Sequence, residues 1–330
     1  MSMLQQIELR AKKILQKIEP WLIEPKPLET SHRLCLSLNG NILTLLHINN
    51  DTNGIEIILN ENLEFSDTPS LGIVLTGVVK RYQLEHTPAY WLLAPDDYQL
   101  FFIDSIPVKG NEFKDALNWR LRSLLTHPIQ ETAVEYFMLP AKKSSSDQPM
   151  VVAVTSRKQQ LADTIELFLK AGVQLANIDI PELALRNLSA ACEKDEKSTA
   201  FLYFYKNMAI LNVTRQKVLY FTRRIMITDN MNQNSPDFYE KLSLEILRYF
   251  DYFQSQWRHP SPSRFYIAAQ QGNPDQIIAG LAKHLTVQLE PFPVSSIIVN
   301  KNKTDQLEND ALLSLGSVLQ QEDTNVKAEY

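Results

Sequence analysis

The sequence predicts a mixed α/β protein with two similar lobes and a smaller α+β subdomain inserted between them. Two observations support this fold class. A pattern of three short strands followed by a helix occurs twice, first near residue 34 and again near residue 200. The chain has 330 residues, of which 44% are hydrophobic, and this is enough apolar material for more than one core. Two unrelated α+β domains are the alternative that this spacing leaves open.

The first strand–helix unit begins at Leu34. Two apolar runs within 34–48 flank Asn39-Gly40, a dipeptide typical of tight hairpins because both residues tolerate positive φ. A third strand is expected over 55–59. Thr68 followed by Pro69 then predicts the start of a helix that runs to about Tyr82.

The middle of the chain has a denser alternation of short elements. Strands are expected over 90–93, 99–104, 133–139, 150–155 and 174–180, and helices over 112–125, 157–170 and 182–191. We expect these elements to form the inserted subdomain. A charged stretch over 193–198 then has the composition of a linker.

The second strand–helix unit follows this linker. Strands are expected over 200–205, 208–213 and 218–223, followed by a long helix over 237–257 with an apolar stripe. A strand over 264–269, a helix over 274–284, a short strand over 287–289 and a closing helix over 310–319 complete the unit. The duplication of three strands and a helix is the layout expected of an actin-like, two-lobed fold.

The two ends of the chain differ in character from the rest. An amphipathic helix is expected over 3–19, where Leu4, Ile7, Ala11, Ile14 and Ile18 fall on one stripe among basic residues. This helix could lie on a membrane surface, pair with a partner helix or dock on its own domain. The expected organisation is therefore a helix and proline-marked linker over 1–29, the first lobe over 30–89, the inserted subdomain over 90–191, the second lobe over 198–320 and a disordered tail over 321–330.

Composition excludes several classes of function. The net charge of -5 disfavours binding to nucleic acid phosphates, so no nucleic acid partner is expected. Two cysteines far apart in sequence, Cys35 and Cys192, indicate a reducing compartment and no disulfide framework. No signal peptide or membrane span is visible. We therefore expect a cytoplasmic protein that meets the membrane only through a partner or its N-terminal helix.

Motifs that would indicate catalysis or a metal are missing from the sequence. The six histidines are far apart, and the sequence contains neither GxSxG nor GxGxxG. Gly72 and Gly77 have the spacing of a phosphate loop, but Val78 and Val79 replace the lysine and hydroxyl residue that such a loop requires. Cys35 alternates with leucines, which favours a buried small side chain over a nucleophile. Asp96-Asp97 indicate a turn. Arg223-Arg224 indicate either a solvated strand end or a contact to an acidic partner.

Three segments carry a resemblance to a known family. These are WLLAPDDYQLFFIDSIPV, the stretch around Trp119-Arg120 that ends in AVEYFMLP, and AGVQLANIDIPELALRNL, all within 90–190. In this order and spacing they resemble the MshI/PilM family of type IV pilus biogenesis proteins, with MshI of the mannose-sensitive (MSHA) pilus the closer match. The cytoplasmic domains of type II secretion GspL proteins are similar in role and fold. The resemblance implies an actin-like fold and a peripheral cytoplasmic protein.

The resemblance also implies three nucleotide loops, and this chain departs from each of them. Ser37 stands where the first loop would have its aspartate, and Tyr203 and Tyr205 stand at the aspartate and glycine positions of the second. The third loop, a glycine run in ATP-binding members, reads AAQQG here and includes Ala269. Only 9 glycines occur in the chain, although phosphate-binding loops depend on them. We therefore expect a pseudo-ATPase that is not an enzyme, with no cofactor and no metal, and with ATP and Mg²⁺ disfavoured.

The implied partner is the cytoplasmic tail of a PilN-like or MshJ-like single-pass membrane protein. Trp119, Arg120 and Arg122 are the candidate binding residues, because tryptophan and arginine often anchor interfaces. The competing interpretation, and the commoner case, is that Trp119 packs beneath its helix. The expected function is thus a non-enzymatic scaffold of a pilus assembly platform. An active actin-like ATPase of pilus assembly and a GspL-like component of type II secretion are the alternatives.

Overall fold

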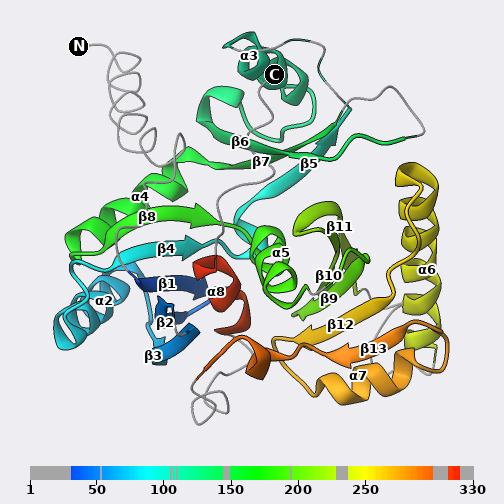
Figure 1. Ribbon diagram of the computed structural model, residues 1–330. Coiled ribbons are helices and arrows are strands. Elements are labelled where there is room, and N and C mark those ends of the chain that lie inside the picture. The colour runs from blue at the N-terminus through cyan, green and yellow to red at the C-terminus, as the bar shows by residue number, and fades with distance from the viewer. Residues whose placement is uncertain are drawn as a thin grey trace.

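The computed structural model describes residues 31–52, 54–104, 106, 108, 111–143, 149–193, 195–227, 237–299 and 311–319. The expected N-terminal helix and the expected C-terminal tail lie outside these residues. Figure 1 shows two sheets side by side, with a third, smaller sheet above the first one.

The first sheet contains five strands in the order β3-β2-β1-β4-β8. Its strands are β1 (His32–Asn39), β2 (Ile42–Asp51), β3 (Gly54–Glu64), β4 (Pro88–Leu92) and β8 (Gln174–Asp179). The β1–β2 turn contains Gly40 at φ +59, which confirms the predicted hairpin. Two helices, α2 (Thr68–Tyr82) and α4 (Lys158–Lys170), cover one face of this sheet (Figure 1). Asp67 caps α2 by accepting from the backbone N–H of Ser70 at 2.8 Å.

The second sheet repeats this topology in the order β11-β10-β9-β12-β13. Its strands are β9 (Thr199–Tyr205), β10 (Met208–Arg215), β11 (Val218–Met226), β12 (Arg264–Ala269) and β13 (Gln288–Pro291). In both sheets a three-stranded antiparallel meander is extended by two parallel strands. Helices α6 (Phe238–Trp257) and α7 (Pro274–Leu281) cover the outer face, and a short helix η4 (Val294–Ser296) follows β13. The predicted duplication is therefore confirmed.

Two helices fill the space between the sheets. These are α5 (Pro181–Cys192) and α8 (Ala311–Val318), which pack against each other in the middle of Figure 1. Apolar side chains of both helices join one cluster with the inner faces of both sheets. At the helix crossing, Gly316 approaches the backbone of Ala184 so closely that a Cβ atom would lie 2.8 Å from the carbonyl carbon. Only glycine admits this contact without displacing a helix.

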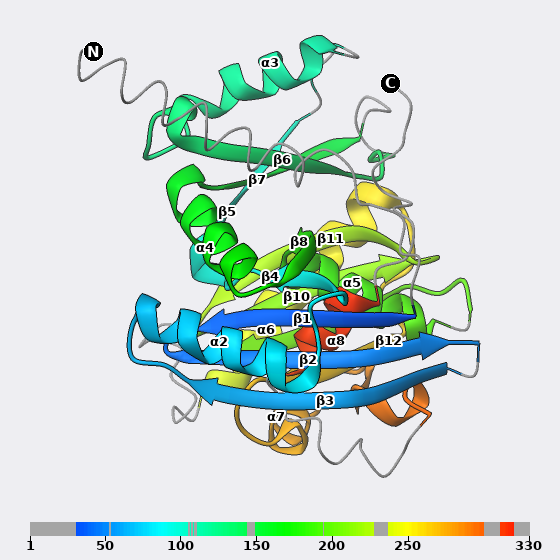
Figure 2. The same ribbon diagram turned by 90° about the vertical axis from the view of Figure 1, so that its left-hand side faces the viewer.

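The third sheet is small and has the order β5-β7-β6. It is formed by β5 (Gln99–Ile103), β6 (Thr132–Leu139) and β7 (Met150–Arg157), accompanied by α3 (Asn111–Leu121) and two short helices, η1 (Pro95–Asp97) and η2 (Ile129–Glu131). Figure 2 shows α3 on the outer side of this sheet, away from the rest of the molecule. Phe113, Leu117 and Leu121 of α3 are buried with side chains of β5 and β7.

The boundaries expected for the inserted subdomain, 90 and 191, are wrong. Strands β4 and β8 pair with each other and with β1, so both belong to the first sheet. Helix α5 lies between the two large sheets and also does not belong to the insertion. The insertion therefore consists of η1, β5, α3, η2, β6 and β7, over residues 95–157. Short apolar strands look alike in sequence whichever sheet they join, and only their pairing distinguishes them.

Candidate functional site

The hairpins of the two lobes meet at the positions expected for nucleotide loops. Ser37 is next to the β1–β2 turn and pairs with Leu92 of β4. Cys35, two residues earlier, joins the cluster between the sheets, and strand alternation places Ser37 and Asn39 on that same side. Cys35 is completely buried, and burial raises the pKa of its thiol to about 12, as fits a core residue.

Bulky side chains occupy the corresponding hairpin of the second lobe. Tyr203 is completely buried and Tyr205 is 5% exposed. The hydroxyl of Tyr205 donates to Oδ1 of Asn39 at 3.2 Å, which connects the two hairpins directly. The ammonium of Lys206 lies 5.2 Å from the centre of the Tyr205 ring. Tyr203 and Tyr205 thus occupy the positions at which the second phosphate loop of ATP-binding members would have an aspartate and a glycine.

Of the third expected loop, Ala268 faces the space between the sheets and Ala269 does not. Ala268 pairs with Tyr203, and both side chains join the cluster between the sheets. Ala269 points to the opposite face, where it packs with residues of α6. The next residue, Gln270, donates its backbone N–H to the carbonyl of Phe204 at 2.8 Å. Ser37, Tyr203 and Tyr205 therefore share one region, and Ala269 lies apart from it.

A buried polar network lies next to this junction. Nε of Arg224, on β11, lies 2.8 Å from Oε1 of Glu182, on α5, and the Tyr98 hydroxyl donates to the other carboxylate oxygen. Asn212 of β10 donates to the Glu182 carbonyl at 2.7 Å, and Arg224 also donates to the carbonyl of Pro95 at 2.9 Å. Burial, together with the nearby Glu182 carboxylate, raises the pKa of Tyr98 well above 10. The network joins α5 and the second sheet to the base of the small subdomain.

This network corrects one interpretation made from the sequence. Arg223-Arg224 were expected to end a strand in solvent or to meet an acidic partner. Arg224 instead pairs inside the molecule with a carboxylate that is fully buried. Arg223 is half-buried and its guanidinium stacks 4.0 Å above the ring of Phe102 on β5. Neither partner is close in sequence, so no local pattern could have revealed these contacts.

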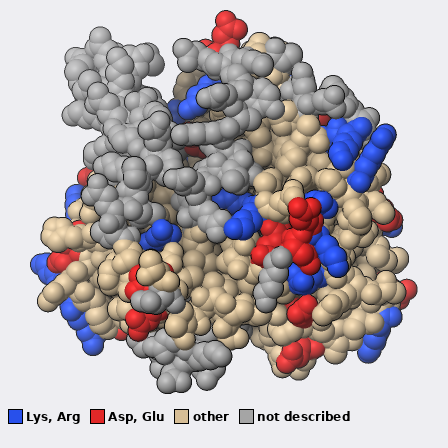
Figure 3. All heavy atoms as spheres, viewed as in Figure 1, with Lys and Arg blue, Asp and Glu red and all other residues tan. Residues whose placement is uncertain are grey.

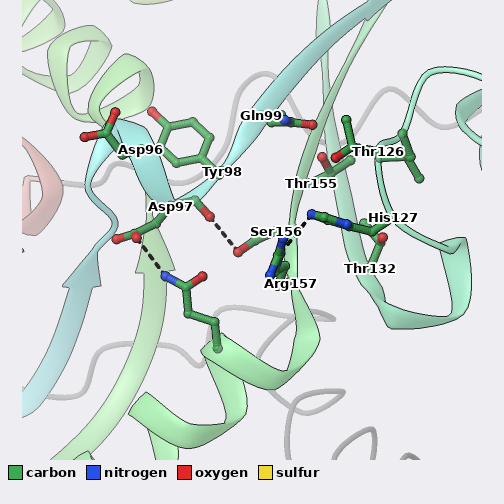
Figure 4. Close-up of a pocket in the computed structure, with 12 residues that line it drawn as sticks. Asp96, Asp97, Tyr98, Gln99, Thr126, His127, Thr132, Thr155, Ser156 and Arg157 are labelled. Atoms are coloured by element: carbon green, nitrogen blue, oxygen red, sulfur yellow. Dashed lines mark hydrogen bonds between the residues drawn. The ribbon is translucent and has the colours of Figure 1, made fainter. Parts of the chain in front are cut away.

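A polar pocket of about 340 Å³ lies between η1, the end of β7 and the start of α4 (Figure 4). Nε2 of Gln160 donates to Oδ1 of Asp97 at 2.7 Å, and the Ser156 hydroxyl donates to the Asp97 carbonyl at 2.7 Å. On the other side, Nε of Arg157 donates to Nε2 of His127 at 2.8 Å. Burial is the main cause that raises the pKa of Asp97, and the bond from Gln160 opposes it.

The pocket offers hydrogen-bonding groups on both sides. Asp97 supplies a carboxylate, and Arg157 supplies a cation. The sequence identified Asp96-Asp97 only as a turn, which η1 confirms. It did not predict the pocket, because the lining residues come from several segments that are distant in sequence. Among the described residues, no group of three or more metal-ligating side chains is arranged to hold a metal ion.

Two candidate partner-binding residues, Trp119 and Arg120, lie in the last turn of α3, and Arg122 follows directly after the helix. Trp119 is 69% exposed, and Arg120 and Arg122 are also exposed. Leu124, just beyond the helix, is 51% exposed. The interpretation that Trp119 packs beneath its helix is therefore wrong, since Phe113 and Leu117 occupy the buried side instead.

On the face shown in Figure 3, described residues of both charge signs are interspersed and do not form one extended basic surface. The described helices also include none that combines the length and apolar character needed to cross a bilayer.

Comparisons with known proteins find similar folds among solved structures. No model of a protein family matches the sequence, and no curated protein matches it either. Among solved structures, a chain of the PilM–PilN type IV pilus biogenesis complex matches with a TM-score of 0.64 at 14% identity, covering 88% of this chain and 98% of that one.

The chain has the actin-like fold. The cytoplasmic domain of EpsL, an inner membrane component of the type II secretion system of Vibrio cholerae, shares it with a TM-score of 0.53 at 12% identity, covering 89% of this chain and 97% of that one. Both matches extend over nearly the whole length of the other chain.

Proposed function

We propose that this actin-like protein is a non-enzymatic, cytoplasmic scaffold that binds the cytoplasmic tail of a single-pass membrane protein in a type IV pilus assembly platform of the MSHA type. The observation that carries the proposal is the similarity to a chain of the PilM–PilN complex over 98% of that chain. A PilN-like or MshJ-like protein is the proposed partner. By binding the cytoplasmic tail of this partner, the scaffold would be held at the inner face of the membrane.

The packing where the hairpins of the two lobes meet supports a function that does not require a bound nucleotide. In a phosphate site the backbone must come close to the ligand, and an acidic side chain must orient Mg²⁺-bound water. Here Tyr203 is fully buried, and the phenol of Tyr205 is bonded to Asn39 of the other lobe. To admit phosphates, these aromatic side chains would have to leave a packed core, which costs several kcal/mol for each large side chain, on the order of 3.

The small subdomain is the proposed recognition element. It presents an exposed tryptophan and Arg120 on α3, Arg122 and Leu124 just beyond the end of that helix, and a polar pocket next to η1. Interfaces are enriched in tryptophan and arginine, because these side chains combine apolar contact with hydrogen bonding. We assign the anchor to Trp119 and Arg122, and polar contacts of an extended tail to the pocket.

Titration of the full chain with synthetic tail peptides tests this proposal. The peptides are the cytoplasmic tails of the PilN-like and MshJ-like proteins, each with a scrambled control. We expect binding of one native tail, and loss of at least about tenfold in affinity in Trp119→Ala, which corresponds to about 1.4 kcal/mol. Leu244→Ala, at a side chain 51% exposed on α6, is the matched control. No binding of any native tail would refute the proposal.

A second candidate is the same role in a type II secretion system. The similarity to the EpsL cytoplasmic domain favours it. The same titration decides between the two, with the cytoplasmic segment of a secretion-system membrane protein as a third ligand. Preference for that ligand over the pilus tails would assign the chain to secretion.

A further inference from the structure

We propose that the groove between α2 and α4 is the docking site of this chain's own N-terminal segment, residues 1–30. The groove measures about 880 Å³. The two helices that form it lie on the outer face of the first sheet, on the side opposite to α5 and α8 (Figure 1). The inference depends on the fold alone and is independent of the proposed partner.

The groove has an exposed apolar surface that the described residues do not cover. Ile73 projects from α2 and is 74% exposed, the highest value among the exposed large apolar side chains of the described residues. Leu167 and Ala171 of α4 line the other side. Burial of this exposed isoleucine side chain by a docked segment would stabilise the protein, because apolar surface would be removed from water.

Two glycines of α2 point to the same conclusion. Gly72 and Gly77 both line the groove and occupy the interior of the helix, where glycine is less favourable than alanine. A Cβ atom at Gly77 would meet no described atom within 4 Å, and one at Gly72 would meet only Leu167 at 4.0 Å. Packing within the described residues therefore does not require either glycine. A helix that lies close along α2 would require both, because small residues let two helix backbones approach.

The N-terminal segment enters the fold at the correct end of the groove. Ser31 accepts a backbone hydrogen bond from Asn50 just before β1 begins. In the parallel register, Leu34 of β1 lies beside Ala89 of β4, and Pro88 of β4 lies beside Gln174 of β8. Helices α2 and α4 end shortly before β4 and β8, so residue 31 lies at the edge of the sheet where both helices end. Lys80 and Lys170 line this end of the groove.

The dimensions and the chemistry of the segment fit this site. The sequence predicts a helix over 3–19, about 25 Å long, and α2 is about 22 Å long. The stretch 20–30 can span up to about 36 Å, which is enough to reach the groove. The apolar stripe of the predicted helix offers a partner for Ile73 and Leu167. Its basic residues, Arg10, Lys12, Lys13 and Lys17, are complemented by Asp163 on α4, whereas Glu166 is already paired with Lys170 at 3.0 Å.

A disulfide pair in the full chain tests the docking. Ala11→Cys, in the middle of the predicted stripe, is combined with Ile73→Cys, and the chain is oxidised under mild conditions at low concentration. The two native cysteines are buried and leave the assay unaffected. We expect an intrachain disulfide in the monomer, and its loss when Ile7→Glu and Ile14→Glu are added. Ala11→Cys with Leu244→Cys on α6 is the matched control, and we expect no disulfide from it.

The remaining outcomes overturn the proposal in distinguishable ways. A disulfide that joins two chains would assign the groove to a second copy. Absence of the disulfide, together with flotation of the wild-type chain on phosphatidylglycerol vesicles, would assign the segment to a membrane surface. Hydrogen exchange gives a readout without cysteines: we expect faster exchange over α2 in the Ile7→Glu/Ile14→Glu variant than in the wild type, and equal rates would contradict docking.

Discussion

Arg224 and Glu182 form an ion pair across the middle of the molecule, with Nε of the arginine 2.8 Å from Oε1 of the glutamate. The carboxylate is completely shielded from water, whereas the arginine side chain is 21% exposed. The Tyr98 hydroxyl donates to the other carboxylate oxygen, and Asn212 donates to the backbone carbonyl of Glu182. A charge buried this deeply depends on its partners, because water is not available to replace them.

Arg224→Met is expected to destabilise the protein by about 3 kcal/mol, since it leaves the Glu182 carboxylate buried without its cation. Urea denaturation measures the loss. The double variant Glu182→Gln/Arg224→Met should recover part of it, because the neutral amide needs no cation and still accepts from Tyr98. Arg223→Met is the neighbouring control, and a loss as large as that of Arg224→Met would contradict the interpretation.

His47 is expected to make the protein sensitive to acid. Its ring is 9% exposed and its Nε2 lies 3.1 Å from Nδ1 of His32. Burial first, and His32 second, lower the pKa of His47 to about 4. An unfolded histidine titrates near 6.5, so the unfolded state binds more protons between these values and stability falls as the pH drops from about 6.5 to about 4. The loss is at most about 3 kcal/mol.

Denaturation at pH 7, 5.5 and 4.5 measures this dependence. In His47→Gln we expect a flatter profile over the same range. His86→Gln, at an exposed histidine, is the control and should follow the wild type. A profile of His47→Gln that coincides with the wild-type profile would show that another group causes the acid sensitivity.

Gly316→Ala is expected to cost about 3 kcal/mol or more, because the added methyl group would meet the backbone of Ala184 and force α5 and α8 apart. Thermal unfolding measures the effect as a lower Tm. Ser255→Ala, on the exposed side of α6, controls for substitution by alanine in a helix. An unchanged Tm in Gly316→Ala would mean that the two helices can separate at no cost.

Millimolar Mg-ATP is expected to leave the Tm unchanged. A ligand present at one hundred times its Kd stabilises a protein by about 2.7 kcal/mol, so even modest affinity would be visible. The packing of Tyr203 and the bond from Tyr205 to Asn39 are the physical reason for the expectation. Isothermal titration with ATP is the parallel measurement. A rise of several degrees would show that a nucleotide site persists, and the function would have to be reconsidered as that of an actin-like ATPase.

The sequence was sufficient to predict the two-lobed architecture, because local signals determine most of it. Asn39-Gly40 defines the first hairpin, Thr68-Pro69 the start of α2, and the apolar stripe from Leu242 to Trp257 the length of α6. These signals depend on neighbours within a few residues. The limits of the insertion depend on which strands pair, and Tyr90 and Ile178 gave no local indication that they belong to the first sheet.

The candidate sites were predicted less completely, for a similar reason. Ser37, Tyr203 and Tyr205 could be placed by resemblance, and the structure brings their hairpins together. The partner of Arg224 lies 42 residues away, and the polar pocket draws on η1, β7 and α4. Exposure of Trp119 could not be inferred either, because a tryptophan on an amphipathic helix is more often buried.

The cluster that joins α5 and α8 to both large sheets determines how this protein can be taken apart. A fragment that ends after α5 would expose the helix face that the second sheet covers, and a fragment that begins at β9 would lack the same helix. Neither half is therefore a self-sufficient module. The small subdomain is tied to this frame as well, because one face of its sheet packs beneath α3 and side chains on the other face join the core cluster of the first lobe. A change in this subdomain can therefore be absorbed at α3, whereas the β6 and β7 side chains that pack on the first lobe have to be kept.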